Sequence, residues 1–174
     1  MSLHLRTPIE SDIPRLAKLG RDTFIETFGP LYSEKDLQSF LTEVYSDATV
    51  AQELADPTLT HQVIEHQDDL IGFAKIGPIH LPIENPAPGA MEIWQIYLRQ
   101  EFLGQGLGEL LLTWALDQLT VAGASEIYLS VFSENDRAIR FYQKHHFQKC
   151  GEYGFPVGDQ IDQEWIMRRT AQPS

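Results

Sequence analysis

The chain has little of several features that mark particular classes of protein. It contains a single cysteine, Cys150, which cannot form an internal disulfide, and no apolar run approaches the roughly 20 residues of a membrane helix. Its first residues, Met-Ser-Leu-His-Leu-Arg, lack the apolar stretch of a secretory signal. These absences exclude a disulfide-stapled domain and predict a reducing, cytoplasmic location with no membrane contact.

Basic residues are also scarce. Lys and Arg number 13 against 25 Asp and Glu, which gives a formal net charge of −12. Nucleic-acid binding depends on basic patches, so this balance argues against a nucleic-acid partner. An acidic surface attracts cationic ligands, although acidity alone often serves only solubility. The length of 174 residues and the hydrophobic content of 43% predict one domain, residues 1–174, with a core of its own.

Two kinds of catalytic machinery are missing. The six histidines do not show the spacing of metal ligands, and no Gly-x-Ser-x-Gly motif offers an acyl-serine nucleophile. His145 and His146 are adjacent, so they point to different faces and are expected to be structural or surface residues. We therefore expect no metal site and no covalent acyl-enzyme.

The most informative segment is rich in glycine. It reads Leu98-Arg-Gln-Glu-Phe-Leu-Gly-Gln-Gly-Leu-Gly-Glu-Leu-Leu-Leu112 and lies between a strand-like run and an amphipathic helix. Glycine lets the backbone turn tightly, and the first N–H groups of a helix have no internal partner. Together with the positive end of the helix dipole, these groups form a binding site for a phosphate or pyrophosphate.

Two familiar phosphate motifs fit this segment poorly. A P-loop needs Gly-Lys followed by Ser or Thr, and the chain has no Gly-Lys pair. A dinucleotide fingerprint beginning at Gly104 or Gly106 would place Glu109 or Leu111 where its third glycine belongs. Glu126 lies at a suitable distance for a ribose-binding acid, which leaves a nicotinamide-dependent oxidoreductase as an alternative that NAD binding would reveal.

Two blocks carry a resemblance to a known family. Gly104-Gln-Gly-Leu-Gly108 resembles the acetyl-CoA-binding motif of GNAT-type N-acetyltransferases, with Leu103 where Arg or Gln is usual. About thirty residues later, Asn135-Asp-Arg-Ala-Ile-Arg-Phe-Tyr-Gln-Lys-His-His-Phe147 resembles the second block of that family, with His146 in the usual glycine position. The segments 23–28, 32, 36–37 and 153–162 are similar to bacterial spermidine/spermine N-acetyltransferases.

The resemblance implies a GNAT fold, a three-layer α/β/α domain whose mixed, mostly antiparallel sheet splays at the cofactor site. Local patterns agree with an alternation of strands and helices. Strands are expected over 4–7, 61–66, 70–80, 91–98, 126–132, 148–155 and 164–169. Helices are expected from a cap at Asp12 to Phe28, from Ser33 to Tyr45, from Ser46 to before Asp56, from about Leu107 to Gly123, and over 135–145.

Direct transfer of an acetyl group to an amine requires proton movements. A primary ammonium group with a pKa near 10.4 is free base in only about one molecule in 2,500 at pH 7, which costs ~4.6 kcal/mol. Glu92, on the strand before the glycines, is our candidate for the base. Tyr142 matches the family's general acid, which protonates the departing thiolate of coenzyme A. No metal takes part.

The resemblance also assigns binding residues. For acetyl-CoA they are Ile96, Tyr97, Leu98, Leu103, Gly104, Gln105, Gly106, Leu107, Gly108, Glu109, Asn135, Ala138, Tyr142 and Lys144. Backbone N–H groups of Ile96–Leu98 would stabilise the oxyanion and receive the pantetheine arm. For a cationic acceptor they are Glu26, Glu34, Asp36 and Glu43.

The acceptor is expected to be a small primary amine, with a polyamine first and a protein N-terminal or lysine amine second. A non-catalytic module that senses coenzyme A is the alternative of another class, because Leu103 and His146 depart from the motif. If the chain self-associates, a homodimer is the expected assembly.

Overall fold

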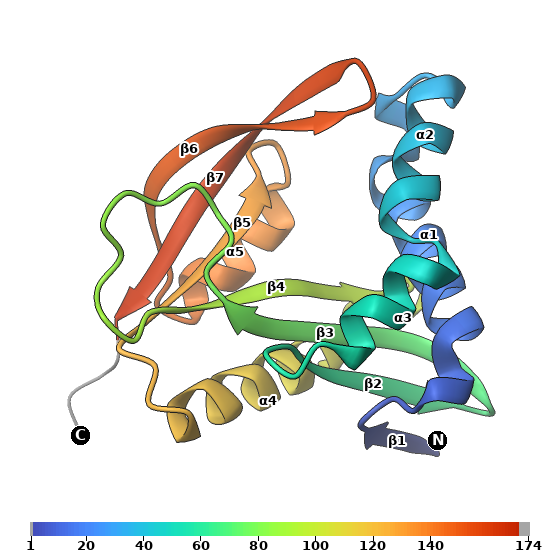
Figure 1. The fold of residues 1–174 in the computed structure, drawn as a ribbon, viewed down its shortest axis with the longest axis horizontal. Coiled ribbons are helices and arrows are strands. Elements are labelled where there is room, and N and C mark those ends of the chain that lie inside the picture. The colour runs from blue at the N-terminus through green and yellow to red at the C-terminus, as the bar shows by residue number, and fades with distance from the viewer. Residues whose placement is uncertain (1, 171–174) are drawn as a thin grey trace.

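One seven-stranded sheet organises the part of the chain that the structure describes. The computed structural model describes residues 2–170 (Figure 1). The strand order is β1-β2-β3-β4-β5-β7-β6, and β4 and β5 form the parallel pair in an otherwise antiparallel sheet. The strands are β1 (Leu3–Arg6), β2 (Thr60–His66), β3 (Asp69–Pro78), β4 (Met91–Leu98), β5 (Glu126–Phe132), β6 (Gln148–Val157) and β7 (Gln160–Thr170). This confirms the expected mixed, mostly antiparallel sheet.

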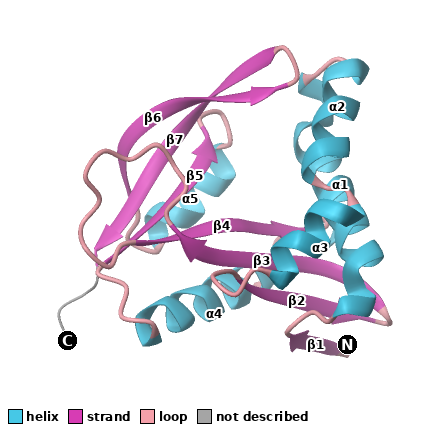
Figure 2. Ribbon diagram, viewed as in Figure 1, coloured by secondary structure: helices cyan, strands magenta, loops and turns pink. Residues whose placement is uncertain are grey.

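Helices cover both faces of the sheet (Figure 2). One face carries the first three α-helices and the other carries the last two, which gives the three layers that the sequence predicted. The α-helices are α1 (Ile13–Phe28), α2 (Glu34–Val44), α3 (Asp47–Ala55), α4 (Leu107–Val121) and α5 (Asp136–Lys144). Short 3-10 turns are η1 (Glu10–Asp12), η2 (Gly29–Leu31) and η3 (Gln100–Phe102).

Each layer of helices packs on the sheet over a separate apolar core. Phe24, Phe40 and Tyr45 pack between α1, α2 and the sheet, while Leu112 and Met167 belong to the core under α4 and α5. Burial of such apolar side chains is the main favourable term in folding. Among residues 2–170, no helix has the length and apolar content that a membrane crossing requires, and no group of His, Cys, Asp and Glu is placed to hold a metal ion.

Helix starts follow the sequence with one exception. The hydroxyls of Ser33 and Ser46 accept backbone N–H bonds of 3.1 Å at the starts of α2 and α3, as predicted. The prediction that the Asp12 side chain caps α1 is wrong. Its carboxylate instead binds the guanidinium of Arg6 at 2.7 Å and that of Arg15 at 2.6 Å. These partners hold the pKa of Asp12 well below its usual range.

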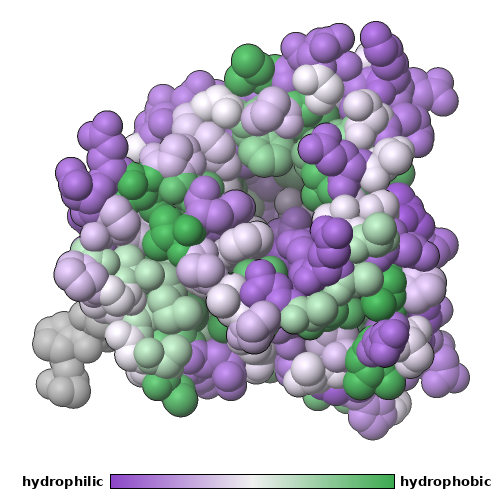
Figure 3. Space-filling view, viewed as in Figure 1, coloured by the Kyte–Doolittle hydropathy of each residue, from purple (hydrophilic) through white to green (hydrophobic). Residues whose placement is uncertain are grey.

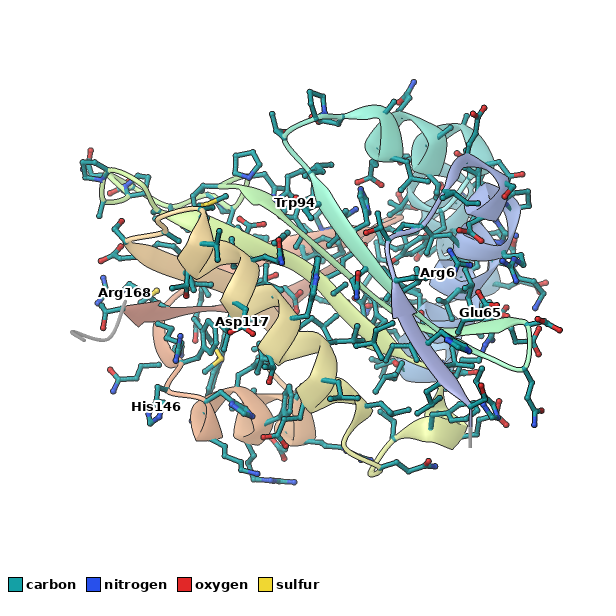
Figure 4. All side chains as sticks on the ribbon, turned by 90° about the horizontal axis from the view of Figure 1, so that it is seen from below. Arg6, Glu65, Trp94, Asp117, His146 and Arg168 are labelled. Atoms are coloured by element: carbon teal, nitrogen blue, oxygen red, sulfur yellow. The ribbon has the colours of Figure 1, made fainter. Side chains whose placement is uncertain are left out.

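Arg6 joins this carboxylate to the neighbouring strand. Its guanidinium also lies 2.6 Å from a carboxylate oxygen of Glu65 on β2, and Figure 4 shows the two side chains together on β1 and β2. The carboxylate of Asp12 is thus paired with Arg6, a residue of strand β1. Helix-cap patterns consider only residues close to the helix start, so they did not predict this partner.

The position of the functional site is set by the parting of β4 from β5. The two strands pair only through Met91 with Ile127 and Glu92 with Tyr128, and they then diverge (Figure 1). On its other edge β4 bulges, because Ile76 pairs with Ile93 and Lys75 pairs with Gln95, which leaves Trp94 extra. The β5-side edge of β4 beyond Glu92 therefore has no strand partner within residues 2–170.

Candidate functional site

The glycine loop ends in an exposed helix start. Gly104 and Gly106 both have φ of +80°, a left-handed conformation that favours glycine. Gly106 is the N-cap residue of α4, no side chain caps this helix start, and a Cβ on Gly106 would meet no atom within 4 Å. The first N–H groups of α4 therefore face open space. This geometry fits the predicted pyrophosphate site over residues 104–109.

A cation that the sequence reasoning missed lies beside this loop. The guanidinium of Arg137 is 3.6 Å from where a Cβ on Gly104 would lie. Leu103, which departs from the family motif, is 40% exposed at the same loop and offers no polar group. Arg137 lies inside the second sequence block, but only the fold shows that this block meets the first.

The second block forms α5, and its two ends fix the helix. At the start, the side-chain oxygen of Asn135 accepts the N–H of Ala138 at 3.2 Å, which confirms the expected cap. At the end, the N–H groups of His146 and Phe147 donate to the carbonyls of Gln143 and Tyr142 at 3.1 Å each. This is a Schellman motif, which requires a left-handed residue.

His146 is the left-handed residue of this motif, with φ of +72°. The departure from the motif thus keeps the backbone shape of the usual glycine and changes only the side chain, which is exposed at the end of α5 (Figure 4). Lys144, in the last turn of the same helix, is also exposed.

Two tyrosines with raised pKa values, Tyr97 and Tyr142, lie within electrostatic range of each other. Burial raises the pKa of Tyr142 on α5 to about 12, so its phenol is protonated at neutral pH. Burial also raises the pKa of Tyr97 on β4, and the neighbouring Tyr45, Glu164 and Tyr142 raise it further. Tyr97 therefore packs against the core under α1 and α2 and is within electrostatic range of Tyr142 on α5.

Glu92 is the last β4 residue that pairs with β5, and its carboxylate already has hydrogen-bond partners. It is 1% exposed, and one oxygen accepts the backbone N–H groups of His80 at 3.1 Å and Leu81 at 3.0 Å. The other oxygen contacts the ring Nδ1 of His80, whose imidazole stacks on Trp94 with 3.8 Å between centroids. The His80 side chain is half exposed, so it links the buried carboxylate of Glu92 to the surface. The base role of Glu92 stays a prediction.

The four acids expected to line an acceptor groove do not meet at one point. Glu26 accepts the N–H of Gln100 at 2.8 Å, and Asp36 accepts the N–H of Asp159 at 3.1 Å in the turn between β6 and β7. Glu34 and Glu43 are exposed on α2. Their role in acceptor binding also stays a prediction.

Two further acids lie on β7. The hydroxyl of Tyr32 donates to Asp162, which is 8% exposed, and Gln160 donates to the other oxygen of Asp162 at 2.9 Å. Glu164 follows two residues later, on the same face of the strand. Burial raises the pKa of Glu164 to about 7, and the nearby Asp162 adds to this rise. The resemblance covered Tyr32 and Asp162 without a role, and it did not reach Glu164.

A hollow opens beside Asp162. Figure 3 shows the face carrying α1 and α2 hollowed between these helices and the β6–β7 arm. A groove of about 400 Å³ opens beside Asp162 and is lined by Leu31, Phe132 and the segments 133–134 and 160–163. The arrangement offers an anion site at α4 on one side of the parted strands and acidic groups on the other.

Comparisons with known proteins agree with this geometry. The model of the acetyltransferase (GNAT) family matches residues 21–147. The spermidine N(1)-acetyltransferase of Thermoplasma acidophilum is 25% identical over 173 residues, which cover 97% of this chain and 98% of that protein. The spermine/spermidine N(1)-acetyltransferase of Bacillus subtilis is 33% identical over 91 residues, or 52% of this chain and 60% of that protein.

A solved structure shares the fold. The crystal structure of PaiA N-acetyltransferase from Thermoplasma acidophilum in complex with coenzyme A superposes with a TM-score of 0.79. Sequence identity is 22%, and the alignment covers 98% of this chain and 100% of that one.

Proposed function

Because the chain belongs to the acetyltransferase (GNAT) family, we propose that it transfers the acetyl group of acetyl-CoA to a primary amine of a polyamine such as spermidine or spermine. Transfer is direct, within a ternary complex of enzyme, acetyl-CoA and amine. The observation that carries the proposal is the parting of β4 from β5 after Glu92. Acetyl-CoA enters this opening from the α4 side and the amine enters from the α1 side.

The residues present fit acetyl-CoA as a co-substrate. The uncapped start of α4 and the nearby Arg137 match the charge of a pyrophosphate. The unpaired edge of β4 beyond Glu92 offers backbone N–H groups to the thioester oxygen. Tyr142, with its raised pKa, is the acid for the departing thiolate. A carboxylate is the base, with Glu92 as the candidate from the sequence.

Several observations support a polyamine as the acceptor. Two relatives named for spermidine or spermine acetylation match 52% and 97% of the chain. The net charge of −12 attracts a cation, Asp162 lines the groove that the amine would enter, and Glu164 follows two residues later on the same strand. A polyamine is an extended cation that can leave one terminal amine near the thioester while its other charges meet acidic groups. The proposal includes a cytoplasmic location, which the single cysteine supports.

A screen of amines tests the proposal. Release of coenzyme A is measured with spermidine, spermine, neutral-tailed amines and peptides with free N-termini or lysines, and corrected for hydrolysis without an amine. We expect spermidine and spermine to have the highest kcat/KM, which falls steeply with salt because screening acts over ~8–10 Å. A salt-independent preference for a peptide would favour a protein acceptor. Coenzyme A binding without turnover of any amine would instead identify a sensor module.

A further inference from the structure

We propose that Glu164 is a catalytic residue that binds the terminal ammonium of the acceptor and takes its proton. The inference rests on the proposed amine acetylation and assigns a residue of this chain to the acceptor side of the same site. Four features of the structure carry it: the strand position of Glu164, the groups within electrostatic range of it, the absence of a protein donor, and its affinity for a proton.

The strand position places Glu164 on the acceptor side of the parted strands. In the sheet, Glu164 lies between Phe132 of β5 and Tyr153 of β6. The ring of Phe132 packs edge-on against Phe28 at the end of α1, 5.9 Å between centroids, so this face of the sheet looks toward α1 and α2. Phe132 lies four residues beyond Tyr128, the last β5 residue paired with β4, or ~13 Å along the strand.

Groups from four elements lie within electrostatic range of Glu164. They are Asp162 on β7, Tyr32 after η2, Tyr97 on β4 and Tyr153 on β6, and Glu164 contributes to the raised pKa of all three tyrosines. Tyr97 is also within electrostatic range of Tyr142, the proposed acid. Tyr97 is thus within electrostatic range of both the acid for the thiolate and the carboxylate that would receive the amine.

Glu164 differs from the other acids of the site in having no donor within residues 2–170. The carboxylate of Glu92 accepts two backbone N–H groups, and that of Asp162 accepts bonds from Tyr32 and Gln160. No side-chain or backbone group of the described residues donates to the carboxylate of Glu164, and no basic side chain pairs with it. Glu164 is half buried, so a bound ammonium would replace solvent at this carboxylate with charge-assisted hydrogen bonds.

The proton affinity of Glu164 suits the task. Burial and the charge of Asp162 raise its pKa to about 7, so at neutral pH it exists in both forms. A base works best when its pKa lies near the working pH. No basic group faces Glu164 among the residues named above, so the incoming ammonium is the cation that would stabilise its charged form.

The proposed step balances in atoms and charge. The carboxylate of Glu164 takes one proton from the ammonium, and the freed lone pair forms the C–N bond to the thioester carbon. The C–S bond then breaks, and the thiolate receives a proton from Tyr142. The second proton lost by the nitrogen returns to Tyr142. Glu164 releases its proton to water, so one proton leaves for each amide formed.

The test compares the wild-type enzyme with Glu164→Gln, Glu164→Asp and the control Asp117→Asn. Asp117 is an exposed acid on α4, on the opposite side of the sheet, so its replacement matches the change in net charge alone (Figure 4). We expect Glu164→Gln to lower kcat/KM for spermidine at pH 7 by roughly 100-fold or more and to remove the rise of kcat/KM through pH 7. Glu164→Asp should keep the rise with a smaller loss. Asp117→Asn should match the wild type.

Two measurements separate this inference from the proposed function. If the wild-type enzyme acetylates amines and Glu164→Gln keeps both the rate and the rise through pH 7, the role of Glu164 is overturned while the function stands. If the wild-type enzyme acetylates no amine, the proposed function fails. Calorimetry with spermidine, on the complex with coenzyme A, then tests ammonium binding by Glu164. Equal affinities of the wild type and Glu164→Gln would overturn it. A loss of affinity of about 10-fold or more in Glu164→Gln would support it.

Discussion

The guanidinium of Arg137 lies against Gly104, with its Nη2 atom 3.6 Å from the position that a Cβ on this glycine would occupy. The start of α5 thereby brings a cation to the loop before α4. The first motif leaves Leu103 where a polar side chain is usual, and the second block supplies a charge from another element. The loop that lacks a polar side chain at Leu103 is therefore the loop that Arg137 of α5 approaches.

This relationship predicts that Arg137 contributes to coenzyme A binding. Arg137→Gln should weaken the affinity by roughly 10-fold to 100-fold, the worth of one charged hydrogen bond at ~1.5–3 kcal/mol. Isothermal titration with coenzyme A measures the change, and Arg140→Gln, an exposed residue of the same helix, serves as the control. Adding Leu103→Arg to Arg137→Gln should recover part of the loss. Equal affinities of Arg137→Gln and the wild type would place the guanidinium outside the pyrophosphate site.

Tyr142→Phe removes a hydroxyl without changing the ring that packs on α5 and the sheet. If this hydroxyl protonates the thiolate, kcat should fall by ~100-fold or more while the affinity for coenzyme A is retained. Steady-state kinetics and titration report the two quantities. Tyr128→Phe is the control, because Tyr128 donates to Glu126 at 2.7 Å near the other end of β5. Unchanged turnover would leave Tyr142 as an aromatic anchor.

Glu92→Gln separates two roles of the most buried acid of the site. As the base, Glu92 would act through His80, so Glu92→Gln and His80→Gln would both flatten the acidic side of the kcat/KM profile. A glutamine oxygen can still accept the two N–H bonds, but more weakly than a carboxylate, and its amide cannot accept from His80, so we instead expect mainly a loss of stability of ~1–3 kcal/mol. Thermal unfolding and the pH profile are measured on both variants. A flattened profile without a change in Tm would restore Glu92 as the base.

His146→Gly should stabilise the protein. A side chain in the left-handed region costs about 1 kcal/mol or more, and glycine at φ of +72° avoids this strain. For a chain of this length the gain corresponds to an increase in Tm of roughly 2–4 °C. Gln143→Gly, within α5, should have the opposite sign because glycine destabilises a helix interior. A lower Tm for His146→Gly would mean that the imidazole makes a stabilising contact.

Glu164 should also make stability depend on pH. Its pKa rises from 4.5 to about 7 on folding, so its favourable contribution is fully present below pH 4.5 and is lost as the pH rises through 7. Glu164→Gln cannot ionise and should therefore raise the free energy of unfolding above pH 7, by roughly 1–2 kcal/mol. The difference between variant and wild type should shrink toward pH 5. Denaturant titrations at pH 5 and pH 8 give both values, and an equal difference at the two would contradict the shift.

Local features of this fold could be predicted from the sequence. The bounds of β4 and β5 match their expected ranges, and Ser33 and Asn135 cap their helices as expected. Alternation, capping and the preference of glycine for left-handed backbone all act within a few residues, so they can be recognised along the chain.

The features that failed or were missed depend on distant partners. The carboxylate of Asp12 leaves the helix start for Arg6 because a strand delivers that charge. Arg137 meets Gly104 only after α4 and α5 pack beside one another. Glu164 lies at the site because β7 inserts between β5 and β6, an order that no local pattern contains. Strand order therefore decided which acid faces the parted strands.

Asp36 joins the two arms that enclose the hollow. Its carboxylate accepts the N–H of Asp159, and a Cβ on Gly158 would come within 2.4 Å of it, so the β6–β7 turn fits tightly against α2. This junction ties α2 to the β6–β7 turn, so the two sides of the hollow cannot separate there without breaking it. If the amine enters the hollow as proposed, an acceptor that needs a wider entrance must also supply the free energy to break this contact.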